Sequence, residues 1–133
     1  MIKLRTSLSV LILVVACSIP AFSETIHCTQ CGMTVDMDSK FTAKIVRADT
    51  ALYFCDIGDL FSYLKKNDAK EGRPEVKDYD TGEWIDAGKA YYVHAENKFR
   101  TPMGWGIAAF KERKNAEAFG GPADFEAAAK SLK

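Results

Sequence analysis

The sequence predicts an α+β fold made of two small ββα units side by side, followed by a short C-terminal helix. Three observations support this. Short segments with strand-like apolar patterns occur in pairs, each pair precedes a segment with helical apolar spacing, and a polar stretch containing glycine and proline separates the halves. A chain of 133 residues has room for one small domain or two very small subdomains.

The first unit contains two predicted strands and one predicted helix. Residues 41–46 alternate, with Phe41, Ala43 and Ile45 on one face, and residues 51–55 form a second apolar run. Asp56 follows as a helix N-cap candidate. The apolar residues after it recur at helical spacing and are Ile57, Leu60, Phe61 and Leu64. The third cysteine of the mature chain therefore lies at a corner between strand and helix.

The second unit repeats this order after a polar linker at residues 65–74. Its predicted elements are extended pieces at 76–79 and 84–86, strands at 90–94 and 107–110, a loop at 95–106 and a helix at 113–119. An amphipathic helix at residues 124–132 ends the chain. We place the two modules at about residues 26–68 and 74–120, within one domain that covers residues 24–133.

The N-terminus has the pattern of a secretory signal. Lys3 and Arg5 precede an apolar run at residues 8–16, which is too short to remain as a membrane span. The small residues at 21 and 23 predict cleavage that removes residues 1–23, whereas a lipobox-like segment ending at Cys17 would remove residues 1–16 and leave that cysteine lipidated. Both routes predict export to the periplasm or cell envelope, with membrane attachment only through a lipid on Cys17.

The charge of the mature chain is close to neutral. Removal of residues 1–23 leaves 16 basic and 18 acidic residues, because Lys3 and Arg5 are the charged residues in that segment. A charge this small argues against nucleic acid and against an anionic membrane surface as partners.

Three cysteines remain in the mature domain, namely Cys28, Cys31 and Cys55. An odd number of thiols in an exported chain indicates a metal ligand, a reactive thiol or an intermolecular disulfide. The simplest alternative is a Cys28–Cys31 disulfide with Cys55 buried and inert. The spacing of Cys28 and Cys31 suits either two thiolates on one metal or one disulfide.

Two methionines add soft ligands to this pattern. Met33 follows Cys31 by two residues, so both side chains point the same way if the segment is extended. Met103 lies between Pro102 and Gly104 in a glycine-rich loop, where packing in a core is less natural. Thiolate and thioether sulfur together select Cu(I). Other residues have simpler explanations: Asp56 and Asp59 suit a helix N-terminus, and Trp84 and Trp105 suit packing.

Four segments in order resemble the NosL family, the copper-delivery accessory proteins associated with nitrous oxide reductase. The segments are Cys28-Thr29-Gln30-Cys31-Gly32-Met33, Tyr53-Phe54-Cys55-Asp56-Ile57-Gly58-Asp59, Thr81-Gly82-Glu83-Trp84-Ile85-Asp86-Ala87, and Pro102-Met103-Gly104 with Ala109-Phe110-Lys111. The resemblance extends from about Cys28 to Phe119. The first half also resembles small treble-clef-like metal-binding domains that begin with CxxCGM.

The resemblance implies that Cu(I) binds between the Cys-Gly-Met segment and the Pro-Met-Gly loop, on Cys31, Met33 and Met103. Cys28 matches the CxxC form of the family. Cys55 departs from it, because a carboxylate is common at this corner in NosL proteins. In the treble-clef group a cysteine is common there and another follows four positions later, where this chain has Asp59. Cys28, Cys31 and Cys55 could therefore hold Zn(II), or Cys55 could extend a copper site.

Three functions remain open from the sequence. The first is a Cu(I) chaperone rather than an enzyme. It would pass copper by Cys/Met ligand exchange to an exported apo-cuproenzyme or to the membrane complex that matures it. The family resemblance suggests nitrous oxide reductase as that enzyme. The second is a structural zinc domain for protein interaction, which would use Cys28, Cys31 and Cys55. The third is a thiol oxidoreductase that uses the CxxC pair, although the βαβ start of a thioredoxin-like module is missing. The chaperone explains the largest number of residues.

Overall fold

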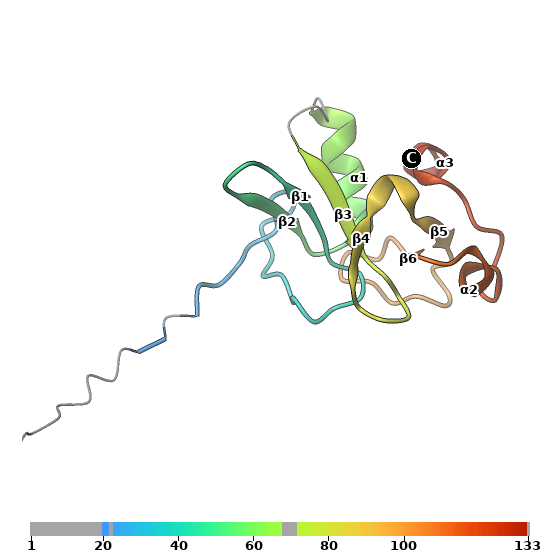
Figure 1. Ribbon diagram of the computed structural model, residues 1–133, viewed down its shortest axis with the longest axis horizontal. Coiled ribbons are helices and arrows are strands. Elements are labelled where there is room, and N and C mark those ends of the chain that lie inside the picture. The colour runs from blue at the N-terminus through green and yellow to red at the C-terminus, as the bar shows by residue number, and fades with distance from the viewer. Residues whose placement is uncertain (1–19, 22, 68–71, 133) are drawn as a thin grey trace, which may run out of the picture.

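The computed structural model describes residues 20–21, 23–67 and 72–132, which form two antiparallel sheets and several short helices (Figure 1). The elements in chain order are β1 (Ala43–Val46), β2 (Ala51–Phe54), α1 (Ile57–Lys66), β3 (Arg73–Lys77), β4 (Trp84–Asp86), the 3-10 helix η2 (Ala87–Lys89), β5 (Tyr91–His94), β6 (Ile107–Phe110), α2 (Arg113–Glu117) and α3 (Phe125–Ser131). This arrangement confirms the α+β class.

The segment β1–β2–α1 forms as its sequence predicts. β1 and β2 pair antiparallel, with Ile45 opposite Leu52. The alternation in β1 buries Ala43 and Ile45 and leaves Lys44 and Val46 partly exposed. The Asp56 side chain accepts a hydrogen bond from the Gly58 N–H at 3.1 Å and caps α1. The predicted apolar stripe of this helix packs into the core, because Ile57, Leu60 and Phe61 are fully buried.

β3 and β4 join the first sheet, which has the order β2-β1-β3-β4. The strand β3 pairs antiparallel with β1 and places Pro74 opposite Ile45, although we expected residues 65–74 to be a linker. Proline lacks an N–H for the ladder, and here β4 pairs with β3 only from Glu75 onward, so Pro74 has no strand on its other side. The extended pieces that we assigned to the second module therefore complete the first sheet.

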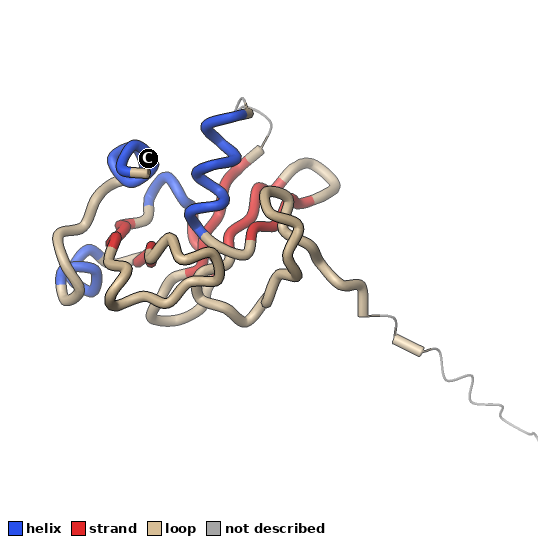
Figure 2. The backbone as a smooth tube through the Cα atoms, turned by 180° about the vertical axis from the view of Figure 1, so that it is seen from behind, coloured by secondary structure: helices blue, strands red, loops and turns tan. Residues whose placement is uncertain are grey.

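The second ββα order consists of β5, β6 and α2. The two strands pair antiparallel, with Tyr92 opposite Ala109, and both contact α2. Backbone hydrogen bonds between Tyr92 and Ala123 connect the segment before α3 to β5. The helix α3 contacts α1, β5 and η2, so it lies between the two parts of the chain. Viewed from behind, several loops lie below α1 (Figure 2).

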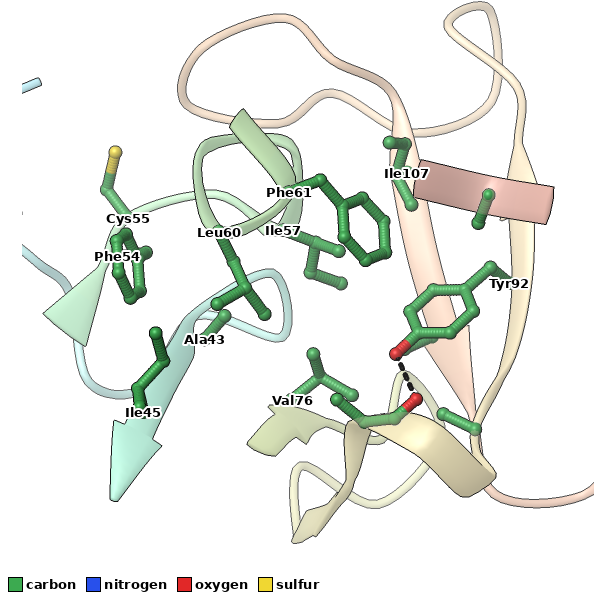
Figure 3. Packing of buried hydrophobic residues seen from close by; sticks show 14 of the residues in the cluster. Ala43, Ile45, Phe54, Cys55, Ile57, Leu60, Phe61, Val76, Tyr92 and Ile107 are labelled. Carbon is green, nitrogen blue, oxygen red and sulfur yellow. Dashed lines mark hydrogen bonds between the residues drawn. The ribbon is translucent and has the colours of Figure 1, made fainter. Parts of the chain in front are cut away.

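One core joins the two sheets. Phe61 of α1 packs against Tyr92 of β5 with ring centroids 5.3 Å apart, and the Tyr92 hydroxyl donates to the Ala87 carbonyl at 2.6 Å. Ala43, Val76 and Ile107 are buried in the same cluster (Figure 3). Cys55 belongs to this cluster too, but its sulfur points away from the aliphatic side chains. The core therefore fixes the corner from which the Cys55 thiol projects.

Residues 1–19 and 22, which carry the predicted signal segment and Cys17, lie outside the described residues. Within the ranges that the structure describes, none of the helices has the length and apolar character needed to cross a bilayer.

Candidate metal centre

The turn at residues 28–33 presents the first two cysteines. The Gly32 N–H donates to the Cys28 carbonyl at 2.9 Å, and the Cys28 N–H donates to the Met33 carbonyl at 2.7 Å. Gly32 has a φ of 77°, in the left-handed region that glycine adopts without strain. The Thr29 N–H donates to the Tyr53 carbonyl at 2.8 Å. This last bond fixes the turn beside the end of β2, where Cys55 follows.

The corner between β2 and α1 supplies the other two donors. Cys55 is 2% exposed and lies immediately before the cap residue Asp56. Asp59 follows four residues later and is 3% exposed. Asp59 lies in the first turn of α1, next to the corner that carries Cys55. The carboxylate therefore reaches back to the thiol, and the Cys55 Sγ lies 3.6 Å from the Asp59 Oδ2.

Cys28, Cys31, Cys55 and Asp59 form one compact group whose ligand atoms all lie within 4.8 Å of one another. The Cys31 and Cys55 sulfurs are 3.4 Å apart, and the Cys28 thiol donates to the Asp59 Oδ2 at 3.4 Å. All three cysteines are free thiols, so the Cys28–Cys31 disulfide that the sequence left open is not formed in this structure. A group of this composition could bind a metal ion.

Burial keeps two of these thiols protonated in the metal-free protein. Desolvation raises the pKa of Cys31, and the Met33 backbone N–H, which hydrogen-bonds the sulfur, opposes this by lowering it. Desolvation also raises the pKa of Cys55, and its contact with Cys31 raises it further. A metal must therefore displace protons from these sulfurs when it binds.

The loop at residues 101–106 lies against the N-terminus of α1 and carries Met103. The Met103 N–H donates to the Asp56 Oδ2 at 3.0 Å, and the Trp105 Nε1–H donates to the Asp59 Oδ1 at 2.9 Å. The Trp105 ring also covers Gly58, where an added Cβ would lie 2.0 Å from the indole. The cap residue Asp56 and two residues of the first turn of α1, Gly58 and Asp59, therefore position the loop beside the cysteine group.

Met33 and Met103 lie at the surface. Their exposed fractions are 49% and 42%, and they are the two large apolar side chains that the described part of the chain leaves exposed. Cys31 is partly exposed, whereas Cys28 and Cys55 are buried. The sulfur-bearing residues thus range from buried thiols to exposed thioethers.

The structure brings together the three predicted cysteines and places each predicted methionine on a segment that adjoins them. It adds Asp59 and Trp105, which the sequence assigned to a helix N-terminus and to packing. The four-residue spacing between Cys55 and Asp59 was visible in the sequence, whereas the contact between Trp105 and Asp59 was not. His27 and His94 lie outside the group: the His27 Nδ1 is 3.2 Å from the Gly32 carbonyl oxygen, and the His94 Nε2 is 3.6 Å from Glu96.

Comparison with known proteins places this geometry in a family. No curated protein matches the chain. A solved structure, that of the copper chaperone NosL from Shewanella denitrificans, has the same fold with a TM-score of 0.65 and 23% sequence identity. The match covers 81% of this chain and 92% of the other. The family model named NosL matches residues 19–123, which is most of the sequence. The chain therefore belongs to the NosL family.

Proposed function

We propose that the protein carries Cu(I) as cargo and delivers it to an exported cuproenzyme, and that it is a binding and transfer protein rather than an enzyme. Membership of the NosL family supports this, as does the similar fold of a protein described as a copper chaperone. The observation that carries the proposal is the convergence of three free thiols beside two segments that each expose a methionine. Thiolate and thioether donors together suit Cu(I) better than harder ions.

Cys31 is the anchor of the proposed transfer site. It is the most accessible of the three thiols, because Cys28 and Cys55 are buried. Met33 is two residues away and half exposed, so an incoming sulfur or nitrogen ligand can reach copper from the same side. Cu(I) tolerates low coordination numbers, and a partner ligand can therefore add before a resident ligand leaves.

Met103 supplies the exchangeable contact from the other segment. Its loop contributes no thiol and is attached to α1 by the Met103–Asp56 and Trp105–Asp59 hydrogen bonds. If these bonds open, the loop can withdraw and uncover the copper without disturbing the cysteine turn. The proposed transfer is thus a ligand exchange in which the cysteine side holds the ion and the methionine side releases it.

The proposed recipient is apo nitrous oxide reductase or the membrane machinery that matures it, as the family suggests. The proposed location of this exchange is the periplasm or cell envelope, which the N-terminal pattern supports, with a lipid anchor only if Cys17 is modified. Neither nucleic acid nor a bare membrane surface is part of the proposal, because the mature chain is close to neutral.

The test is competition for Cu(I) between the reduced protein and a chromophoric chelator under anaerobic conditions. We expect Met33→Ala combined with Met103→Ala to weaken Cu(I) binding by at least about tenfold, roughly 1.4 kcal/mol, and to slow transfer to an acceptor. Met37→Ala is the matched control, because Met37 is partly buried against the core. Unchanged affinity and unchanged transfer in the double variant would show that the thioethers do not bind copper.

A further inference from the structure

The two exposed methionines have a property that copper transfer alone does not use, because a reagent dissolved in water reaches them directly. The Met33 and Met103 side chains are 49% and 42% exposed, whereas Cys28 and Cys55 are 3% and 2% exposed. Cys31 lies between these extremes and is partly exposed. Among the sulfur-bearing residues of the candidate metal centre and its two adjoining segments, the methionines are therefore the first that a dissolved oxidant meets.

Oxidation of these side chains needs no unfolding. The carbonyl of Met33 accepts the Cys28 N–H at 2.7 Å, and the Met103 N–H donates to the Asp56 Oδ2 at 3.0 Å, so both backbones are fixed while both side chains face solvent. A thiol must lose its proton before it becomes a strong nucleophile. A thioether has no such proton, and its sulfur lone pair is available at once. The folded, metal-free protein is thus the form that an oxidant attacks.

Oxidation also changes what these residues can bind. Methionine sulfoxide is polar and chiral, whereas methionine is flexible and apolar. The added oxygen uses a sulfur lone pair, and oxygen donors suit hard ions rather than Cu(I). An oxidised Met33 or Met103 therefore stays on its segment of the chain but no longer offers copper a soft ligand.

We propose that Met33 and Met103 are modification sites, which hydrogen peroxide or hypochlorous acid oxidises to methionine sulfoxide, and that this oxidation reversibly stops copper transfer. The inference rests on the proposed function for the use of both thioethers as copper contacts. The oxidation itself needs only their exposure. The segments that carry the two methionines thus make transfer sensitive to oxidants in the surrounding solution.

Both directions of the reaction use reagents of a stated class. A sulfur lone pair attacks one oxygen of hydrogen peroxide, an S–O bond forms and the O–O bond breaks. The hydroxide that leaves takes the proton of the transferred oxygen and becomes water, so the sulfur loses two electrons and the peroxide gains them. A methionine sulfoxide reductase reverses the change with a dithiol, which supplies two electrons and two protons and becomes a disulfide, while the oxygen leaves as water.

The experiment exposes the reduced protein to hydrogen peroxide and then restores the thiols with dithiothreitol, which does not by itself reduce methionine sulfoxide. Peptide mass spectrometry locates the added oxygen. Met33 and Met103 should be oxidised several-fold faster than Met37, which is partly buried against the core. After the reductant is removed, Cu(I) affinity measured by chelator competition should be lower by at least about tenfold. Treatment with a methionine sulfoxide reductase should restore it.

Met33→Leu combined with Met103→Leu is the matched control, because leucine keeps an apolar side chain but has no sulfur to oxidise. The Cu(I) affinity of this variant should be the same before and after peroxide. Oxidation of Met37 as fast as of the other two would overturn the proposal, and so would sulfoxides at both exposed positions with unchanged Cu(I) affinity. The transfer function is contradicted separately, by a Met33→Ala, Met103→Ala variant that binds and transfers copper as the wild type does without any oxidant.

Discussion

The turn at residues 28–33 and the loop at residues 101–106 each expose a methionine, but different interactions hold them in place. The turn carries two of the three thiols of the cysteine group, Cys28 and Cys31, and a backbone hydrogen bond attaches it to the end of β2. The loop carries no thiol and is attached through the carboxylates of Asp56 and Asp59. The turn is thus joined to β2 through the backbone. The loop has its end held by the backbone hydrogen bond from Ala95 to Gly106, but it is joined to α1 through side chains.

The largest expected effect comes from removing the Cys31 thiol in the turn at residues 28–33. Cys31→Ser should weaken Cu(I) binding by more than about 100-fold, because losing a ligand should cost more than the 10- to 100-fold typical of an outer partner. Met103→Ala removes a neutral thioether and should cost about tenfold or less. Chelator competition under anaerobic conditions measures both. Equal losses would show that the two segments contribute equally, contrary to the comparison.

The next effect concerns the packing of the 101–106 loop on α1. Gly58→Ala should lower the free energy of unfolding by about 1–3 kcal/mol, because the new Cβ would lie 2.0 Å from the Trp105 ring and force it to move. Urea unfolding measures the change. Gly121→Ala is the control, since nothing lies within 4 Å of the Cβ it would add. A neutral Gly58→Ala variant would mean that the loop adapts without strain.

The smallest effect is a pH dependence that originates at Asp56. Burial raises the pKa of this carboxyl, although hydrogen bonds from Thr101, Met103 and Gly58 oppose the shift. Because the folded pKa lies above the unfolded value of about 3.9, its contribution to stability is fully present below that value and is lost as pH rises through the folded pKa. The stability advantage of the wild type over Asp56→Asn should therefore be larger at pH 4 than at pH 7.

Urea unfolding of both proteins at the two pH values checks this. An advantage that grows toward neutral pH would mean that the hydrogen bonds outweigh burial at Asp56, and that the carboxylate holds the loop more firmly than its surroundings indicate.

Local sequence predicted the first half of the fold well, and long-range pairing was less accessible. The alternation at residues 41–46 and the cap at Asp56 are local properties, so β1 and the start of α1 followed from them. The pairing of β3 with β1 involves residues about thirty positions apart, and neither segment's pattern specifies its partner. Pro74 favoured a linker, because proline has no backbone N–H to donate to a neighbouring strand. This restriction matters little at Pro74, because β4 pairs with β3 only from Glu75 onward.

The candidate site shows the same difference between local features, which the sequence predicts, and long-range contacts, which it does not. Cysteine and methionine can be identified as candidate ligands by residue type. The three cysteines that the structure brings together could therefore be named from the sequence, and a role for the two methionines stays a prediction. Asp59 and Trp105 could not be assigned to the site in this way, because an acidic residue in a first helical turn and a tryptophan in a loop usually have simpler roles. Their contact joins segments that are 46 positions apart in the chain.

The 3.4 Å contact between the Cys31 and Cys55 sulfurs also makes the metal-free protein susceptible to oxidation. In an oxidising compartment, an external oxidant can take two electrons from such a pair, release both thiol protons and leave a disulfide, with Cys28 as an unpaired thiol. A bound ion occupies the same sulfur electrons and blocks that reaction. If the chain is exported as its N-terminus predicts, metal binding competes with disulfide formation. The relative rates of these two reactions then determine the fraction of the protein that keeps the thiols available for metal.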